Sequence, residues 1–561
     1  MSDQDKAAKR AHWEEINRAK AAAKQKEQSA TEKPEPRAGV AHKQFQAIRG
    51  TRDLLPPDTA LWNRVEQTAD EVFTTFGFGE IRPPIFEPTD LFARSIGEET
   101  DVVSKEMYSF LDAPDVSYLE DARDAVKDVN PGIGAEGKHD VFELYVYNFI
   151  SEVEKSLASR QLNLPSKAQS DFDVLKASYQ ELLALPDSKD EESNNKRRLL
   201  SFEIIIKTDL LRFGDFVTLR PEATASVCRA YIEHNMQQLP QPVKLYYMGP
   251  MFRRERPQKG RYRQFYQIGA EILGGPDAPA IDAELIEMLM TFFDKCGLQG
   301  TELSINSIGH AADNCRRGYV AKLKGELEKV KDKLGADSQR RIETNPLRVL
   351  DSKLEHEQAI IATLPRIADH LCDECKAHYA AVKHELELRG VIYRENWRLV
   401  RGLDYYMRTT FEITAQGLGS QNAVCGGGRY DGLVELLGGP PTKGIGFAIG
   451  EDRLILSLQE SGKGAAPQGR DVYIAWMGER AYATAIRAAK DLRNAGFRVE
   501  LPPTELKFGK ALERASKLGA RFALILGDNE VADGQWTLKT LADGSQQKLT
   551  EQALLEYLRG L

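Results

Sequence analysis

The stretch Phe252–Glu271, FRRERPQKGRYRQFYQIGAE, concentrates residues that bind anions and flat rings. Arginine guanidinium groups match phosphate oxygens with paired hydrogen bonds and stack on planar groups. A solvated basic loop would account for the charge, but less easily for the aromatic residues and the final carboxylate. We therefore expect Arg253 and Arg261 to hold a triphosphate and Phe265 to stack on a base. Arg453, at the start of a predicted helix, could close the other face of that base.

A second segment, TLRPEATASV, carries polar groups that suit an amino acid. Glu222 and Thr224 are two residues apart and would share one face of a strand. A carboxylate with a hydroxyl group suits a substrate ammonium group. An ion pair between Glu222 and Arg220, with Thr224 as a helix N-cap, explains the same residues equally well.

A third segment, LVRGLDYYMRTTFEI, crowds polar and aromatic groups at the junction of a turn and a strand. Arg401 and Asp404 precede the adjacent pair Tyr405 and Tyr406. Neighbouring residues of a strand point to opposite faces, so one tyrosine is expected in the core. The other could offer its hydroxyl group to a polar ligand.

The common nucleotide-binding motifs are absent. GIGFAIG does not satisfy GxGxxG, GGGRYDG lacks the acidic residue at dinucleotide spacing, and no GxxxxGK[ST] occurs. If ATP binds, it must bind on another platform.

A CxxC motif, Cys372 and Cys375, has His370 and His378 close by in HLCDECKAH. Zinc sites usually take ligands from two segments, and the sequence contains no second CxxC. The surrounding helical pattern favours free thiols, so no metal is predicted, although zinc is an open alternative.

Composition limits the class of protein. The 561 residues suffice for about three domains, and the net charge of −8 excludes a global basic field for nucleic acid. No apolar run approaches the roughly 18 residues of a membrane span, and no signal core or transit peptide is evident. Six cysteines in so long a chain do not indicate a disulfide framework, so a cytoplasmic protein is expected.

The order of patterns predicts the elements that position these groups. KLYYMGPMF and YQIGAEILG should form a long hairpin, and EMYSF should pair with FVTLRPEAT across a helical insert. FGFGEIRPPIFEP reads as an edge strand interrupted by prolines. FEITA, NAVCGGGRYDGL and GIGFAIGEDRLILSL read as a strand, a glycine-rich turn, and a strand followed by a helix. The pattern after SGKGAAPQG alternates strand and helix, which is typical of a small α/β domain.

Together these motifs resemble the bacterial-type histidyl-tRNA synthetases, which are class II aminoacyl-tRNA synthetases. GEIRPPIFEP is similar to motif 1, the basic stretch to motif 2, and GIGFAIGEDRL to motif 3. LVRGLDYY and CGGGRYDGL are similar to the two signatures of the histidine enzymes. Asp452 departs from the glutamate usual in motif 3. The motifs cover residues 45–111 and 213–561, and no counterpart of the insert is recognised.

The resemblance implies roles for individual residues. The implied histidine site is Glu222, Thr224, Gln267, Glu271, Arg401, Tyr405 and Tyr406. The implied ATP site is Arg253, Glu255, Arg261, Phe265 and Arg453. The residues implied in catalysis are Arg401, Arg253 and Glu222. Glu271 and Tyr406 would bracket the imidazole, and Arg401 would act as a cationic electrophile beside the reacting phosphate.

The resemblance also implies a fold and partners. The expected class is α+β, an antiparallel-sheet catalytic domain with helical insertions and a C-terminal α/β anticodon-binding domain. The expected parts are a charged extension at 1–45, a catalytic domain at 46–111, 213–309 and 391–460, a helical insert of unknown role at 112–212, a helical insertion domain at 310–390, and an anticodon-binding domain at 468–561. Histidyl-adenylate formation from L-histidine and ATP with Mg²⁺, transfer to tRNA(His), and a homodimer are implied.

Two rival hypotheses share this fold. A non-catalytic paralogue usually loses the RGLDYY arginine, motif 2 residues or the C-terminal domain, and none is lost here. A class II synthetase for another amino acid would lack LVRGLDYY and GGGRYD. An assay of ATP–pyrophosphate exchange with each amino acid separates the three.

Overall fold

The computed structural model describes residues 45–97, 100–112, 117–128, 138–158, 166–185, 191–211, 215–415, 422–463 and 469–560. All but the last residue of the predicted N-terminal extension lies outside these ranges. Within them, the largest sheet has the strand order β1-β5-β6-β11-β10-β9-β7-β8. Its strands are Gly79–Glu80 (β1), Val243–Phe252 (β5), Gln264–Leu273 (β6), Glu302–Ser307 (β7), Arg394–Glu395 (β8), Met407–Thr414 (β9), Ala423–Arg429 (β10) and Gly444–Gly450 (β11).

The sheet is antiparallel except at its two edges, where β1 pairs with β5 and β7 with β8 in parallel. Helices α2 (Thr59–Thr75), α9 (Pro279–Cys296), α13 (Asp373–Leu388) and α15 (Glu451–Glu460) bury one face of the sheet in a single core. Aromatic rings fill its centre, where Phe73 packs against Tyr246, Phe292 and Phe447. The opposite face is left for other contacts.

The predicted hairpin of β5 and β6 is confirmed, with Val243 opposite Leu273 and Phe252 opposite Gln264. Side chains of β6 alternate between the two faces of the sheet. Ile268, Ala270 and Ile272 belong to the core on the helix-covered face. The odd-numbered residues of β6 therefore face the other side, and these include three predicted site residues.

The glycine-rich segment corrects the sequence-based prediction. Gly426, Gly427 and Gly428 lie inside β10, paired with both β9 and β11, rather than in a turn. A Cβ atom on Gly427 would lie 2.5 Å from the ring of Phe411 and 2.4 Å from the carbonyl oxygen of Gly446. The glycines thus leave room for neighbouring groups inside a strand. A run of glycines is equally common in a turn, so composition alone cannot tell the two apart.

A smaller sheet has the order β2-β4-β3, with β2 at Phe86–Pro88, β3 at Tyr108–Asp112 and β4 at Asp215–Leu219. The predicted antiparallel pairing of EMYSF with FVTLRPEAT is confirmed as β3 with β4. The proline-containing segment forms two short strands, β1 and β2, each at the edge of a sheet, as predicted. Helix α3 (Thr89–Ile96) packs beside this sheet, and α8 (Thr224–Glu233) packs against α3.

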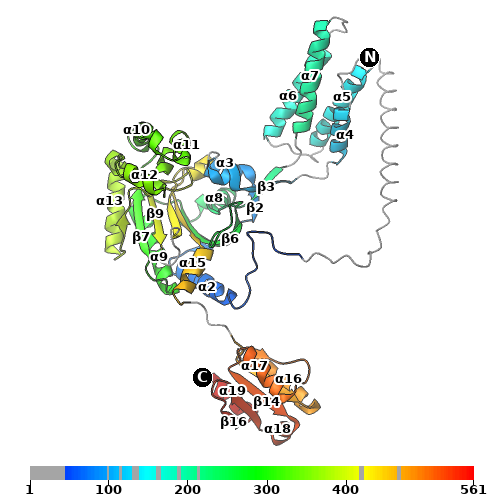
Figure 1. The fold of residues 1–561 in the computed structure, drawn as a ribbon, viewed down its shortest axis with the longest axis vertical. Helices are drawn as coiled ribbons and strands as arrows, with labels where there is room; N and C mark the ends of the chain where they lie inside the picture. Colours follow the sequence, from blue (N-terminus) through cyan, green and yellow to red (C-terminus); the bar gives the residue numbers. More distant parts are fainter. Residues whose placement is uncertain are drawn as a thin grey trace.

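Between β3 and β4 the described residues form four helices that bury a core of their own. They are α4 (Ser117–Asp128), α5 (Lys138–Ala158), α6 (Ser166–Leu183) and α7 (Glu191–Leu210). Phe142, Phe149 and Phe172 are buried in this core. Figure 1 shows the four helices grouped together beyond β3, clear of the large sheet.

Residues 310–390 are mostly helical, as predicted. The helices are α10 (Arg316–Glu328), α11 (Ala336–Thr344), α12 (Glu355–Ile361) and α13, with short 3-10 turns η3 (Lys331–Lys333), η4 (Pro346–Asp351) and η5 (Ile367–His370) between them. They share a core that also includes Tyr406. This segment therefore packs next to the site predicted around LVRGLDYY.

The C-terminal segment forms a five-stranded sheet of order β13-β12-β14-β15-β16. In chain order its elements are β12 (Val472–Met477), α16 (Glu479–Asn494), β13 (Val499–Glu500), α17 (Phe508–Lys517), β14 (Phe522–Gly527), α18 (Asp528–Asp533), β15 (Trp536–Thr540), β16 (Gln546–Leu549) and α19 (Glu551–Arg559). The predicted alternation of strand and helix holds through β14. The antiparallel hairpin of β15 and β16 was not predicted. Among the described helices, none has the length and apolarity that crossing a membrane requires.

Candidate active site

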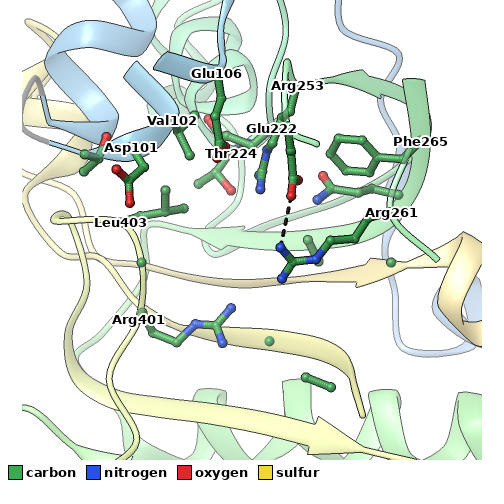
Figure 2. A pocket seen from close by; sticks show the side chains of 18 of the residues that line it. Asp101, Val102, Glu106, Glu222, Thr224, Arg253, Arg261, Phe265, Arg401 and Leu403 are labelled. Carbon is green, nitrogen blue, oxygen red and sulfur yellow. Dashed lines mark hydrogen bonds and ion pairs between the residues drawn. The ribbon is translucent and has the colours of Figure 1, made fainter. Parts of the chain in front are cut away.

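A cavity of about 940 Å³ opens on the face of the large sheet opposite α2 and α9. Every predicted site residue except Glu271 lines it: Glu222, Thr224, Arg253, Glu255, Arg261, Phe265, Gln267, Arg401, Tyr405, Tyr406 and Arg453. Figure 2 shows Arg253, Arg261 and Arg401 reaching the same space from different segments. The cavity wall therefore combines residues that lie up to 231 positions apart in the sequence.

Glu222 lies buried at one end of the cavity, at the start of α8. Its carboxylate accepts hydrogen bonds from the backbone N–H groups of Thr224 at 2.7 Å and Ala225 at 3.0 Å. Burial raises the pKa of Glu222, although these two hydrogen bonds act in the opposite direction. Glu222 therefore satisfies the first N–H groups of the helix and still faces the cavity.

The alternative interpretation of this segment is wrong in both parts. Arg220 makes no ion pair with Glu222; it donates to the backbone carbonyls of Pro83 at 2.7 Å and Pro250 at 3.0 Å. Thr224 is the first residue of α8 rather than its N-cap, and its hydroxyl group donates to Glu271 at 2.7 Å. The Thr224 hydroxyl thus links the cavity to the carboxylate beneath it.

Glu271 lies directly under the cavity wall and is 1% exposed. Besides Thr224, the hydroxyl group of Tyr430 donates to it, at 2.6 Å. A Cβ atom on Gly446 of β11 would lie 1.6 Å from Oε2 of Glu271, so only glycine leaves room for this carboxylate. Burial raises the pKa of Glu271 to about 8, against the effect of both hydroxyl groups.

Gln267 completes this end of the cavity. It stands on the same face of β6 as Glu271, since the two are four residues apart. Its Oε1 atom is buried and accepts no hydrogen bond within the described part of the chain. A buried acceptor without a donor is costly, so this oxygen is suited to a ligand that brings N–H groups.

The other end of the cavity is lined by cations and an aromatic ring. The Arg253 guanidinium lies 5.3 Å from the ring centre of Phe265 and donates to the carbonyl of Pro221. Arg261 pairs with Glu255 at 3.1 Å, the interaction drawn dashed in Figure 2. Three charged residues of the basic hairpin, Arg253, Glu255 and Arg261, thus face the cavity.

Arg453 stands at the start of α15 and donates to the carbonyl of Ala423 at 2.9 Å. Burial lowers the pKa of Arg453, and the positive charges of Arg261 and Arg253 lower it further. The guanidinium groups therefore repel one another across the cavity. A polyanion bound between them would relieve that repulsion.

Arg401 crosses the cavity floor over β10. It pairs with Glu412 at 3.3 Å, and its guanidinium lies 5.8 Å from the ring centre of Tyr406. A Cβ atom on Gly426 would lie 2.1 Å from this guanidinium, so the glycine of β10 makes the close approach possible. This contact explains one glycine of the CGGGRYDG signature.

One of the two tyrosines lies in a core as expected, since Tyr406 is buried, but the expectation that Tyr405 and Tyr406 point to opposite faces is wrong. Strand β9 begins only at Met407, so the tyrosines lie in the preceding turn, where the alternation of a strand does not apply. Their ring centres are 4.7 Å apart and both residues line the cavity.

Several residues of the site were not predicted. Tyr430 holds Glu271 but was seen only as part of a glycine-rich signature. Arg340, Arg341 and Arg348 of the segment 310–390 reach the cavity mouth, and Asn345 donates to Asp404 at 3.1 Å. Their contribution depends on how two distant segments pack, for which the sequence holds no local signal.

The comparisons with known proteins agree with this arrangement. The family model described as "Histidyl-tRNA synthetase" matches residues 201–454, and that described as "Anticodon binding domain" matches residues 471–561. A histidine–tRNA ligase of Koribacter versatilis is 45% identical over 519 residues, which are 92% of this chain and 96% of that protein. One of Solibacter usitatus is 44% identical over 92% of this chain and 99% of its own length.

The chain belongs to the histidyl-tRNA synthetase family. The apo structure of the S. aureus histidyl-tRNA synthetase also matches, with a TM-score of 0.62, 32% identity, and coverage of 92% of this chain and all of that one. The predicted class, an α+β catalytic domain with a C-terminal anticodon-binding module, is confirmed. The motifs alone placed the whole insert at 112–212 outside the resemblance. The aligned 519 residues are too many for that, so part of the insert has a counterpart in the Koribacter versatilis protein.

Proposed function

We propose that the chain joins L-histidine to tRNA(His) in two steps, both carried out in this cavity. The observation that carries the proposal is the convergence of three arginines and Phe265 at one end of a cavity whose other end holds buried carboxylates. The arginine end suits ATP, and the carboxylate end suits the ammonium and imidazole groups of histidine. Family membership supports the overall reaction.

At the carboxylate end, Glu222, Thr224 and the unpartnered oxygen of Gln267 would hold the α-ammonium group. Glu271 and Tyr406 would bracket the imidazole ring, with Tyr405 beside them. A buried acid discriminates strongly, because an apolar amino acid of similar shape would leave its hydrogen bonds unmade. This end therefore selects the amino acid.

At the arginine end, Phe265 and Arg453 would enclose the adenine, with Glu255 near its polar edge. Arg261 would bind the terminal phosphate and Arg253 the α-phosphate. ATP would enter as its Mg²⁺ complex, and Glu255 and Glu106 are acidic groups on the cavity wall available to that cation. The charge of the nucleotide would offset the mutual repulsion of the arginines.

In the first step the histidine carboxylate attacks the α-phosphorus of ATP. A bond forms between carboxylate oxygen and phosphorus, the bond to the bridging oxygen breaks, and pyrophosphate leaves. Arg401 lies between the two ends and would neutralise the charge that develops on the phosphoryl oxygens. The remaining groups act by holding the reactants in line.

In the second step a hydroxyl group of the terminal tRNA ribose attacks the carbonyl carbon of the adenylate, and AMP leaves. The segment β12 to α19, which matches the anticodon-binding family model, would bind the anticodon arm. Arg340, Arg341 and Arg348 at the cavity mouth would meet the acceptor end of the tRNA.

A homodimer is part of this proposal, with the cytoplasm as its location. One face of the β2-β4-β3 sheet carries Phe86 and Phe110, which are 54% and 47% exposed. Their rings are neighbours, with centres 6.5 Å apart, and so form an exposed aromatic pair across β2 and β3 that a second copy of the chain could cover. Sedimentation at micromolar concentration should show twice the chain mass; a fully active monomer would contradict the dimer.

Histidine-dependent ATP–pyrophosphate exchange tests the activity. Exchange should appear with L-histidine and stay at background with each of the other amino acids. Exchange with a different amino acid would show a synthetase of other specificity. Binding of histidine without exchange would show a non-catalytic paralogue.

A further inference from the structure

Four metal-ligating side chains meet outside the cavity, at the junction of β7 with the segment 310–390. The ligand atoms of His310, Cys315, Cys372 and Cys375 all lie within 4.8 Å of one another. The CxxC motif supplies two of them, and the chain just after β7 supplies the other two. The fold thus provides the second segment that the sequence did not reveal.

We propose that these four residues bind one structural zinc ion, with three thiolates and one imidazole. Zinc in such sites is tetrahedral, with Zn–S near 2.3 Å and Zn–N near 2.0–2.1 Å, which places ligand atoms about 3.5–3.8 Å apart. Nδ1 of His310 lies 3.1 Å from Sγ of Cys375 and 3.7 Å from Sγ of Cys372. Small side-chain rotations therefore suffice to admit the ion.

The backbone is arranged to present the sulfur atoms together. Cys372 is the N-cap of α13, and the N–H group of Cys375 donates to its sulfur at 3.5 Å. Cys315 is the N-cap of α10. The positive end of a helix favours thiolate over thiol, so the N-termini of α13 and α10 would stabilise the thiolate forms of Cys372 and Cys315 that bind zinc.

The turn that carries His310 is shaped by its neighbours. Gly309 has φ +63°, and a Cβ atom there would lie 2.6 Å from Sγ of Cys315. The carbonyl of His310 accepts hydrogen bonds from Ala312 and Arg316, which folds the chain back on itself. His310 and Cys315 thereby reach the same side of the turn.

The histidines nearest to the CxxC motif in sequence are engaged elsewhere. Nε2 of His370 lies 3.3 Å from Nζ of Lys322, and Nε2 of His378 lies 3.9 Å from both Asp277 and Asp282. Spacing along the chain therefore points to the wrong imidazoles. The three-dimensional arrangement selects His310.

The site is of the closed kind. Cys315 and Cys375 are each 1% exposed, and His310 and Cys372 are half-buried, so the protein supplies four ligands and leaves no position for substrate. Binding would displace three thiol protons to solvent and leave a net charge of −1. Arg316 and Arg408 interact electrostatically with Cys375 and would offset that charge.

The position of the site in the fold indicates a structural role for the ion. The carbonyl of Gly309 accepts from the N–H group of Arg408 in β9, and Arg316 donates to the carbonyl of Tyr406. Zinc would therefore fasten the helices of 310–390 to the sheet directly behind a predicted histidine-binding residue. It would stabilise the site without taking part in the reaction.

Metal analysis of the full chain tests the proposal. Protein purified under reducing conditions without chelator should contain about one zinc per chain by mass spectrometry. The variants Cys372→Ser and His310→Ala, both at half-buried positions, should lose most of it. Cys296→Ala removes a thiol from the hydrophobic core between the large sheet and its helices, outside the cluster, and this variant should keep the wild-type zinc content.

Cobalt substitution provides a readout that does not depend on the variants. Wild-type chain reconstituted with Co²⁺ should show the thiolate-to-metal charge transfer and strong visible absorption of a tetrahedral thiolate site. Absence of both zinc and this spectrum in folded wild-type protein would overturn the proposal. Zinc content unchanged in the two ligand variants, or a disulfide found among Cys315, Cys372 and Cys375 in the reduced preparation, would overturn it as well.

Discussion

The two ends of the cavity hold charge in opposite ways. At the proposed histidine end, Glu222 and Glu271 are buried and accept hydrogen bonds from backbone, threonine and tyrosine donors, and burial raises the pKa of both. At the proposed ATP end, the cations are only partly paired: Arg261 pairs with Glu255, while Arg453 donates to a backbone carbonyl. One end therefore favours neutral acids, and the other keeps excess positive charge.

Under the proposed function, this difference in charge would let one cavity distinguish histidine from ATP. A polyphosphate at the carboxylate end would meet buried acids, and an ammonium group at the arginine end would meet like charge. Each substrate would thus have one favourable orientation, with the reacting carboxylate and phosphate close to Arg401. The predictions below separate the two ends.

The largest effect is expected for Arg401→Ala, at the boundary between the ends. Loss of a group that stabilises transition-state charge typically costs about 10²–10³ in kcat. The KM values for ATP and histidine should change far less. Steady-state pyrophosphate exchange measures both, with Arg394→Ala, an exposed arginine of β8 paired with Glu302, as the matched control. Near-normal kcat with a raised KM would contradict the role.

Glu271→Gln should damage only the histidine end. A buried polar group that loses its hydrogen-bond partner costs about 1–3 kcal/mol, so the KM for histidine should rise about 5–150-fold. The KM for ATP should stay near the wild-type value, because the Glu271 carboxylate lies at the end of the cavity away from Phe265 and the arginines. Equal changes in both KM values would show a general disturbance of the fold.

Phe265→Leu should damage only the ATP end. Stacking of a base on an aromatic side chain contributes about 1–3 kcal/mol, and leucine retains part of the apolar contact, so we expect a rise of about 5–30-fold in the KM for ATP. Histidine binding, measured by calorimetry without ATP, serves as the control. A variant with weaker histidine binding but unchanged KM for ATP would reverse the assignment of the two ends.

The raised pKa of Glu271 predicts a pH dependence of stability. The folded protein holds this proton up to a pKa of about 8, whereas the unfolded chain releases it near 4.5. Between these values the folded state binds more protons, so this group's contribution to the free energy of unfolding falls as pH rises. Glu271→Gln should flatten that slope between pH 5 and 8 in denaturant titrations without substrate. An unchanged slope would show that Glu271 does not titrate in this way.

The smallest effect is expected from removal of the insert. Residues 113–211 leave and rejoin the sheet at Asp112 and Asp215, which face each other across β3 and β4. Replacement by a short Gly/Ser turn should leave pyrophosphate exchange within about twofold, because the chain ends already lie together. Charging of tRNA is measured in parallel. Loss of exchange in a folded variant would place the insert in the catalytic machinery.

Elements and site residues that depend on neighbouring positions in the sequence could be predicted. The hairpin of β5 and β6 follows from two apolar runs around a basic loop, and the residues on its inner face could be named in advance. Prediction failed where the outcome depended on packing between distant segments. The glycines of β10 make room for Arg401 and Phe411, and Tyr430 and His310 gain partners about 160 and 60 residues away. No window of sequence contains those pairs.

The most direct test of the two-ended cavity is a crystal structure of the chain with L-histidine and a non-hydrolysable ATP analogue. Our account predicts the imidazole between Glu271 and Tyr406, the ammonium group at Glu222 and Gln267, and the adenine against Phe265. The α-phosphate should then lie beside Arg401, in line with the histidine carboxylate. An imidazole at Phe265, or phosphates bound away from the arginines, would contradict it.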